Sequence, residues 1–189
     1  MTAALVPFSV EYTEIPGLAV LRMKQITDER GTVREFFRQS AMAEAGLHVG
    51  PWQQLNVTET RPGAVRGLHG EAMTKLVAIV SGAGFGAYVD TRPDSPARGK
   101  VVTVDLTVGT QVLVPAGVCN GFQVISPGPA QYLYCFDREW VPGMSGTAVH
   151  PLDPALGIAW PVDIDPSDRS LLSAKDAAQP TLAEALADR

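Results

Sequence analysis

The feature that most constrains the fold of this chain is the segment at positions 63–82, in which glycines bound a strand-like run that contains a histidine. It reads GAVRGLHGEAMTKLVAIVSG. His69 lies six positions after Gly63, and Lys75 follows a short polar turn. Gly82 closes the apolar run that comes next. Apolar runs of this length between turn residues are typical of buried strands in β-sandwiches and barrels.

A second glycine-spaced segment begins at Gly109 and reads GTQVLVPAGVCNGF. Pro115, Gly117 and Asn120 follow at intervals of six, two and three positions. Together, the two spacings resemble the two signatures of cupin β-barrels. The resemblance implies an all-β fold, a cupin-type double-stranded β-helix (jelly roll) barrel with a few short helices. The 18 glycines and 15 prolines of the chain agree with many short strands between turns.

Three of the four positions at which cupins usually hold a metal ion are altered here. Glu71 stands in place of a second histidine, Lys75 in place of a glutamate, and Asn120 in place of a histidine. An ammonium at ligand distance repels a divalent cation, and His69 alone offers too few ligands. We therefore predict no metal and no other cofactor, and we expect His69 to perform acid-base chemistry.

The length and texture of the chain predict one domain. A chain of 189 residues and 20.1 kDa suffices for one all-β barrel with a sizeable core. From Pro142 onward, proline-rich connections replace periodic segments, and none is long enough to build a second core. We expect a single cupin domain over residues 1–189, with a barrel core at about 17–141 and a wrapping C-terminal tail at about 142–189.

Charge and cysteine content exclude several classes of protein. The net charge of −5, from 15 basic and 20 acidic side chains, gives no basic field for nucleic acid. No apolar run approaches membrane length, and residues 1–10 lack the pattern of a signal peptide. Cys119 and Cys135 lie in apolar strands without CxxC spacing, which indicates buried thiols and not a disulfide. We predict a soluble cytoplasmic protein that binds neither nucleic acid nor membrane.

Strand alternation leaves two orientations open. In VRGLH, simple alternation places His69 and Arg66 on opposite faces, unless Gly67 marks a bulge. In TVREFFRQ, Glu35 enters the barrel if its face is the buried one, and it is solvated if Phe36 is the core residue.

Two other strands place polar groups on one face. Gln54 and Asn56 share a side of PWQQLNVTET, where they either bind a ligand or face water. Tyr134 shares its face with Tyr132 and Phe136, and an aromatic stripe of this kind is more often part of a core.

Several segments, taken in order, resemble the dTDP-4-dehydrorhamnose 3,5-epimerase (RmlC-like) family of deoxysugar epimerases, from about residue 12 to about residue 186. They read DERG, QQLNVT, GAVRGLH, TKLV, VDTRPDSPARGK, VPAGVCNGF, YLYCFDREWVP and LSAKDAAQPTLAE. Each segment is a weak signal alone, but their collinear order is specific. The resemblance implies a cofactor-independent isomerase of deoxysugar biosynthesis, such as that of rhamnose. It would invert C3, C5 or both of a nucleotide-linked sugar such as dTDP-4-keto-6-deoxyglucose.

The resemblance also implies roles for individual residues. His69 of RGLH is the base that removes the proton beside the ketone, and Asp176 of LSAKD pairs with it. Tyr134 is the acid on the opposite face of the sugar ring, and Lys75 stabilises the enolate. Contacts with the substrate fall on Arg30, Glu35, Gln54, Asn56, Arg66, Asn120 and Trp140.

Two of these positions depart from the family pattern. Asn120 replaces the histidine of an HGF motif, and its neutral amide donates a hydrogen bond without carrying charge. More of the charge stabilisation then falls on Lys75. Trp140 replaces a tyrosine and retains an aromatic platform for the nucleotide base.

The sequence alone leaves two other functions open. A ketoisomerase on the same scaffold would move the carbonyl group, and a non-catalytic nucleotide-sugar-binding cupin would bind the sugar without exchanging its protons. We also predict a homodimer, because family members pair barrels through their sheets and the early β-like segments offer edges that need covering.

Overall fold

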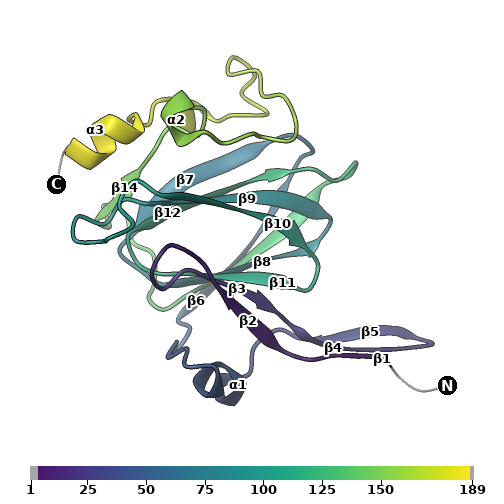
Figure 1. Cartoon of the computed structure of the whole chain (residues 1–189). Helices are drawn as coiled ribbons and strands as arrows, with labels where there is room; N and C mark the ends of the chain where they lie inside the picture. The colour runs from purple at the N-terminus through teal and green to yellow at the C-terminus, as the bar shows by residue number, and fades with distance from the viewer. Residues whose placement is uncertain (1–3, 188–189) are drawn as a thin grey trace.

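The computed structural model describes residues 4–187 and shows two large antiparallel sheets that face each other (Figure 1). The six-stranded sheet has the order β2 (Ser9–Tyr12), β3 (Ala19–Arg22), β11 (Thr110–Val114), β8 (Lys75–Ser81), β13 (Ala130–Phe136) and β6 (Gln54–Thr60). The five-stranded sheet has the order β10 (Val101–Thr107), β9 (Ala83–Asp90), β12 (Val118–Val124), β7 (Val65–Glu71) and β14 (Gly146–Ala148). Consecutive strands from β7 to β9 and from β10 to β13 alternate between the sheets, which is the predicted jelly roll.

The main core lies between the two sheets. Phe122 of β12 stacks on Tyr132 of β13, with ring centroids 4.0 Å apart and an interplanar angle of 8°. Both rings are fully buried, so this aromatic contact joins one sheet to the other. Cys119 and Cys135 are also buried, as predicted for small apolar side chains.

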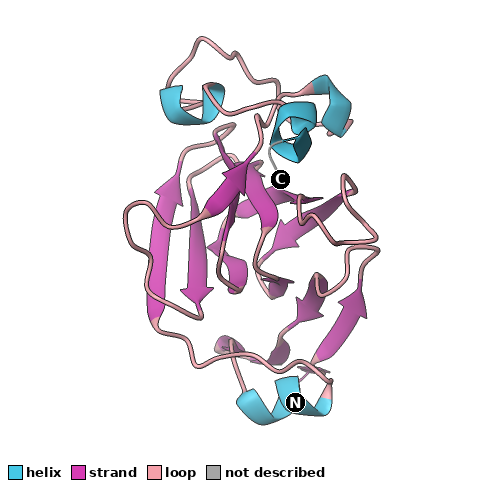
Figure 2. Ribbon diagram, turned by 90° about the vertical axis from the view of Figure 1, so that its left-hand side faces the viewer, coloured by secondary structure: helices cyan, strands magenta, loops and turns pink. Residues whose placement is uncertain are grey.

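A three-stranded sheet, which we name the N-terminal arm, extends away from the two large sheets (Figure 1). It consists of β1 (Ala4–Val6), β4 (Lys24–Asp28) and β5 (Gly31–Glu35). Val33 at its centre is 72% exposed, although alternation alone allowed it to face a core. The helix α1 (Gln39–Glu44) follows the arm and lies at the opposite end of the molecule from the other helices (Figure 2).

The C-terminal segment after β14 covers the outer face of the five-stranded sheet with η1 (Pro154–Leu156), α2 (Ala174–Ala177) and α3 (Leu182–Ala187). Leu156 and Leu182 pack there on Leu68 of β7. The backbone N–H of Val65 donates to the carbonyl of Leu171 at 2.8 Å, which ties the segment to β7. Within residues 4–187, no helix has the length and apolar character needed to span a bilayer.

An irregularity in β7 decides which side chains reach the interior. Asn120 of β12 pairs with His69, but Phe122 pairs with Arg66, so three positions of β7 match two of β12. This extra residue is a β-bulge, and it places Arg66 and His69 on the same side. Gly67 allows it, because a Cβ there would lie 2.5 Å from the Cα of Gly121 and its φ is +128°.

Candidate active site

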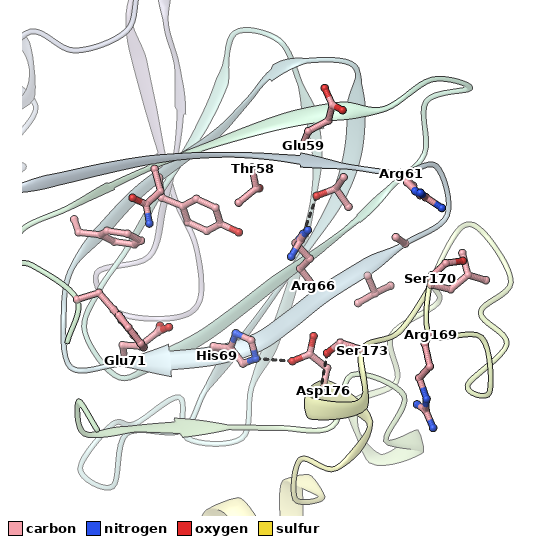
Figure 3. Close-up of a pocket in the computed structure, with 18 of the residues that line it drawn as sticks. Thr58, Glu59, Arg61, Arg66, His69, Glu71, Arg169, Ser170, Ser173 and Asp176 are labelled. Atoms are coloured by element: carbon pink, nitrogen blue, oxygen red, sulfur yellow. Dashed lines mark hydrogen bonds and ion pairs between the residues drawn. The ribbon is translucent and has the colours of Figure 1, made fainter. Parts of the chain in front are cut away.

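A cavity of about 540 Å³ lies between β6, β7 and β13, and the C-terminal segment forms one of its walls (Figure 3). The side chains of Arg61, Arg66 and Arg169 line it, and so do the carboxylates of Glu59, Glu71 and Asp176. Figure 3 shows Arg61 and Arg169 toward one end and Glu71 toward the other. A guanidinium group suits an anionic ligand such as a phosphate.

His69 of β7 and Asp176 of α2 form a hydrogen-bonded pair in this cavity, with 2.7 Å between Nε2 and Oδ1 (Figure 3). The histidine side chain is 31% exposed, whereas the aspartate side chain is 7% exposed. When Nε2–H donates to the carboxylate, Nδ1 carries the lone pair. The imidazole is therefore oriented as a base whose accepting nitrogen faces away from Asp176.

The first turn of α2 fixes the position of Asp176. Ser173 caps this helix, and its Oγ accepts a hydrogen bond from the backbone N–H of Asp176 at 3.0 Å. Burial raises the pKa of Asp176, but the hydrogen bond and charge of His69 and the hydrogen bond from Ser173 outweigh it, so the pKa is lowered. Asp176 is therefore a carboxylate at neutral pH and holds one tautomer of His69.

Tyr134 lines the same cavity from the opposite sheet, since β13 belongs to the six-stranded sheet and β7 to the five-stranded one. Burial raises the pKa of Tyr134 to about 12, with the charge of Arg66 opposing the rise. The phenol keeps its proton at neutral pH and is able to donate it. A proton acceptor and a proton donor thus face the cavity from opposite walls.

Lys75, at the start of β8, is 3% exposed. Its ammonium donates to the backbone carbonyl of His69 at 3.1 Å, to Oδ1 of Asn120 at 2.7 Å and to the carboxylate of Glu71. These residues border a recess of about 50 Å³, which Tyr134 also lines. A buried positive charge therefore lies beside both the acceptor and the donor of protons.

Asn120 lies in the small recess beside Lys75. It is 5% exposed and borders this recess and not the larger cavity. Its amide oxygen accepts from Lys75, and its contact with the substrate stays a prediction. The packing of β12 against β7 turns this side chain inward, so Asn120 orients the ammonium. Among residues 4–187, no three histidine, cysteine, aspartate or glutamate side chains are grouped to hold a metal ion.

Four of the predicted substrate contacts line the cavity: Gln54, Asn56, Arg66 and Trp140. Asn56 lies directly across from Tyr134 in the pairing of β6 with β13, and so shares its face. Gln54 accepts from the backbone N–H of Trp140 at 2.7 Å, and Nε of Arg66 donates to Thr60 at 2.8 Å. These contacts hold the side chains in place before any ligand binds.

Arg30 and Glu35 lie outside the cavity, in the N-terminal arm, so a single chain does not bring them to the site predicted for them. The Arg30 side chain is 89% exposed and pairs with Asp28. Glu35 pairs with Arg38, and the neighbouring Phe36 packs on the cluster beside α1. Both residues lie in the arm because β4 pairs with β1 on one side and with β5 on the other, and with neither large sheet.

Several lining residues were not predicted as part of the site, among them Glu71, Arg61, Arg169 and Ser173. Glu71 had a usable signal, because it follows His69 by two positions and so shares its strand face. Arg169 had none, because it lies in an irregular loop that only the docking of the C-terminal segment brings to the cavity.

The fold and the site together define a class of protein. An imidazole held by a carboxylate, a protonated phenol on the opposite wall and a buried ammonium are the groups that move protons at a carbon next to a carbonyl. A jelly-roll barrel with this site belongs among the isomerases that invert such carbons.

Comparisons with known proteins identify the family. The family described as dTDP-4-dehydrorhamnose 3,5-epimerase matches residues 12–184. The chain is 36% identical over 180 residues to the dTDP-4-dehydrorhamnose 3,5-epimerase of Salmonella typhimurium, which covers 92% of this chain and 95% of that protein. It is 38% identical over 167 residues to a dTDP-4-dehydro-6-deoxyglucose 3-epimerase of Streptomyces bikiniensis, with 84% and 81% covered. The chain belongs to this family of isomerases.

Solved structures agree with this assignment. A 4-keto-6-deoxy sugar epimerase from the novobiocin cluster of Streptomyces spheroides superposes with a TM-score of 0.88 at 29% identity, covering 100% of this chain and 94% of that one. A 3'-monoepimerase from Streptomyces bikiniensis in complex with dTDP-quinovose gives 0.81 at 34% identity, covering 90% and 86%. The predicted family and the predicted jelly-roll fold are confirmed.

Proposed function

We propose that this protein is an epimerase that inverts C3, C5 or both of a dTDP-linked 4-keto-6-deoxy sugar in deoxysugar biosynthesis. One observation carries the proposal: His69, held by Asp176, and Tyr134 face one cavity from opposite sheets, beside the buried Lys75. The similar proteins support this substrate class, because they are named as 3,5-epimerases and as 3-epimerases of dTDP-4-keto-6-deoxy sugars.

The proposed reaction passes through an enolate. Nδ1 of His69 takes the proton from the carbon next to the ketone. The electrons of that C–H bond form the C=C bond of the enolate, and the π electrons of the carbonyl group move to its oxygen. The ammonium of Lys75 stabilises this oxyanion by about 3 kcal/mol, the scale of one preorganised donor. Tyr134 gives its phenolic proton to the opposite face and inverts the centre. Proton exchange with water then restores the imidazole and the phenol.

The rest of the cavity supports a nucleotide diphosphate as the carrier of the sugar. The guanidinium groups of Arg61, Arg66 and Arg169 suit the diphosphate, because one guanidinium group can donate two parallel hydrogen bonds to two oxygens of a phosphate. Trp140 is 49% exposed at the cavity and offers a ring on which a base can stack.

We also propose a homodimer in which the N-terminal arm contacts a second copy. Large apolar side chains are exposed on the arm and on the edge strand β6, at Leu5, Val6, Ile26, Val33, Leu55 and Val57. Such side chains favour burial against another chain, and β6 and β5 both end their sheets. The second copy would also be the route by which Arg30 and Glu35 meet a substrate. The cytoplasmic location stays a prediction.

The test is incubation with dTDP-4-keto-6-deoxyglucose in heavy water, with NMR of the sugar. Deuterium at C3, C5 or both, with inversion of the labelled carbon, is the expected result and also counts the centres. A carbonyl that moves to another carbon indicates a ketoisomerase. Binding without any uptake of deuterium indicates a non-catalytic cupin, and either outcome overturns the proposal.

A further inference from the structure

The ammonium of Lys75 donates all of its hydrogen bonds to groups inside the protein. An ammonium has three N–H donors and no acceptor. Here one donor goes to the carbonyl of His69, one to the amide oxygen of Asn120 and one to the carboxylate of Glu71. An enolate oxygen that is stabilised by Lys75 must therefore take the place of one of these three acceptors.

Of the three acceptors, only the carboxylate of Glu71 lies within reach of a ligand. The His69 carbonyl belongs to the backbone of β7, and Asn120 is 5% exposed. The Glu71 side chain is 27% exposed and lies two positions after His69 on the same strand (Figure 3). It lines the main cavity and also a second cavity of about 470 Å³, so it has space to move.

We propose that Glu71 is a positioning residue: it holds the Lys75 ammonium in place in the resting site, and it yields its contact to the ketone oxygen as negative charge develops there. The inference deepens the proposed epimerase function and rests on it. The second cavity, which Lys175 lines, offers the released carboxylate water and another cation.

The charges around Glu71 support this exchange of partners. Burial raises the pKa of Glu71, but the charge and hydrogen bond of Lys75 outweigh it, so the pKa is lowered and the group is a carboxylate at neutral pH. Without this carboxylate, the buried ammonium of Lys75 lacks its counter-charge and one of its three acceptors. The titratable and charged groups that surround it are His69 and Arg66 on β7, Lys75 on β8, Tyr134 on β13, Asp176 on α2 and Lys175 beside the second cavity.

The test substitution is Glu71→Gln, which keeps the shape and removes the charge. Deuterium uptake by the dTDP-4-keto sugar is followed at neutral pH in the Tyr134→Phe background, so that only exchange from the side of His69 is measured. We expect kcat for uptake to fall about tenfold or more while KM changes less than about threefold.

Three further variants separate positioning from a structural effect. Glu71→Asp should recover part of the loss in kcat, because it restores the charge. Glu59→Gln removes another carboxylate from the cavity wall, one that accepts from Gln131, and should lower kcat far less than Glu71→Gln does. In a Lys75→Met background, Glu71→Gln should cause little further loss, because its partner is already absent.

The inference is overturned if Glu71→Gln leaves kcat unchanged, or if Glu59→Gln lowers kcat as far. It is also overturned if the loss from Glu71→Gln is as large without Lys75 as with it. Calorimetric binding of dTDP shows that each variant is folded, and Glu71→Asp serves for the comparison if Glu71→Gln is not. Failure of the proposed function has a different signature, because the unaltered protein would then take up no deuterium.

Discussion

The cavity and the N-terminal arm both carry charged side chains, but the two regions hold those charges in opposite ways. In the recess beside the cavity, Lys75 is 3% exposed and donates to three acceptors. In the arm, the Arg30 side chain is 89% exposed and its partner is Asp28, two positions away. Catalysis by charge depends on groups that are already oriented and shielded from water. We therefore expect Arg30 of the arm to contribute to catalysis only if a second copy covers it.

The strongest test of the cavity is His69→Asn, which removes the proton acceptor and retains a polar side chain. Deuterium uptake should be abolished at every carbon, a loss of at least ~10²–10⁴-fold, because no other base is held at this position. Binding of dTDP, measured by calorimetry, should persist through Gln54, Asn56 and the arginines. Uptake at the parent rate would show that the base lies elsewhere.

Tyr134→Phe tests the proton donor on the opposite wall and should affect inversion far more than proton exchange. His69 still removes the proton and can return a deuteron to the same face, so exchange continues. Inversion should slow by ~10²–10⁴-fold, because the opposite face lacks its donor. NMR reads exchange and inversion in one sample. Inversion as fast as in the parent would assign the acid to a different group.

Asp176→Asn tests whether the pair with His69 stabilises the fold, and the readout is the pH dependence of thermal stability. The folded-state pKa of Asp176 lies below the ordinary 3.8. This carboxylate therefore stabilises the fold above that pH, and the contribution is lost as the pH falls through the lowered value. Thermal unfolding at pH 7 and at pH 3 should differ less in the variant than in the parent. An equal difference in both proteins would mean that the pair does not stabilise the fold.

The smallest effect is expected in the arm. Arg30→Ala removes an exposed pair and should change the melting temperature by less than about 2 °C. If the arm of a second copy serves the cavity, activity should fall, and mixing with inactive His69→Asn should restore part of it through mixed dimers. Sedimentation at micromolar concentration checks the dimer directly. If the protein is a monomer, or if Arg30→Ala retains full activity, the arm does not contribute to the site.

The strands of the barrel could be predicted from the sequence, but the bulge that shapes the site could not. Spacing around Gly63, His69 and Gly82 predicted the barrel strands, because turns and apolar runs are local properties. The bulge at Gly67 stayed open, because alternation predicts faces only when each strand pairs in regular register. The close approach of Gly121 is what decides it.

Only part of the site that the sequence predicted comes together in a single chain. The family resemblance assigned Asp176 to His69 across 107 positions of sequence, and the structure brings the two to 2.7 Å. It also assigned Arg30 and Glu35 to the substrate, and the single chain places both in the exposed arm. A resemblance transfers residues but does not say which copy of the chain presents them.

Short, ordered motifs of the sequence were enough to predict the kind of barrel and the candidate residues of its site. The pairing of those residues depends on the tertiary structure, in which the amide oxygen of Asn120 accepts from Lys75 and the carboxylate of Glu71 accepts the third hydrogen bond of that ammonium. The physical reason is that hydrogen-bond partners depend on how two sheets and a returning C-terminal segment pack. That packing is the joint outcome of many weak contacts, which no single motif specifies.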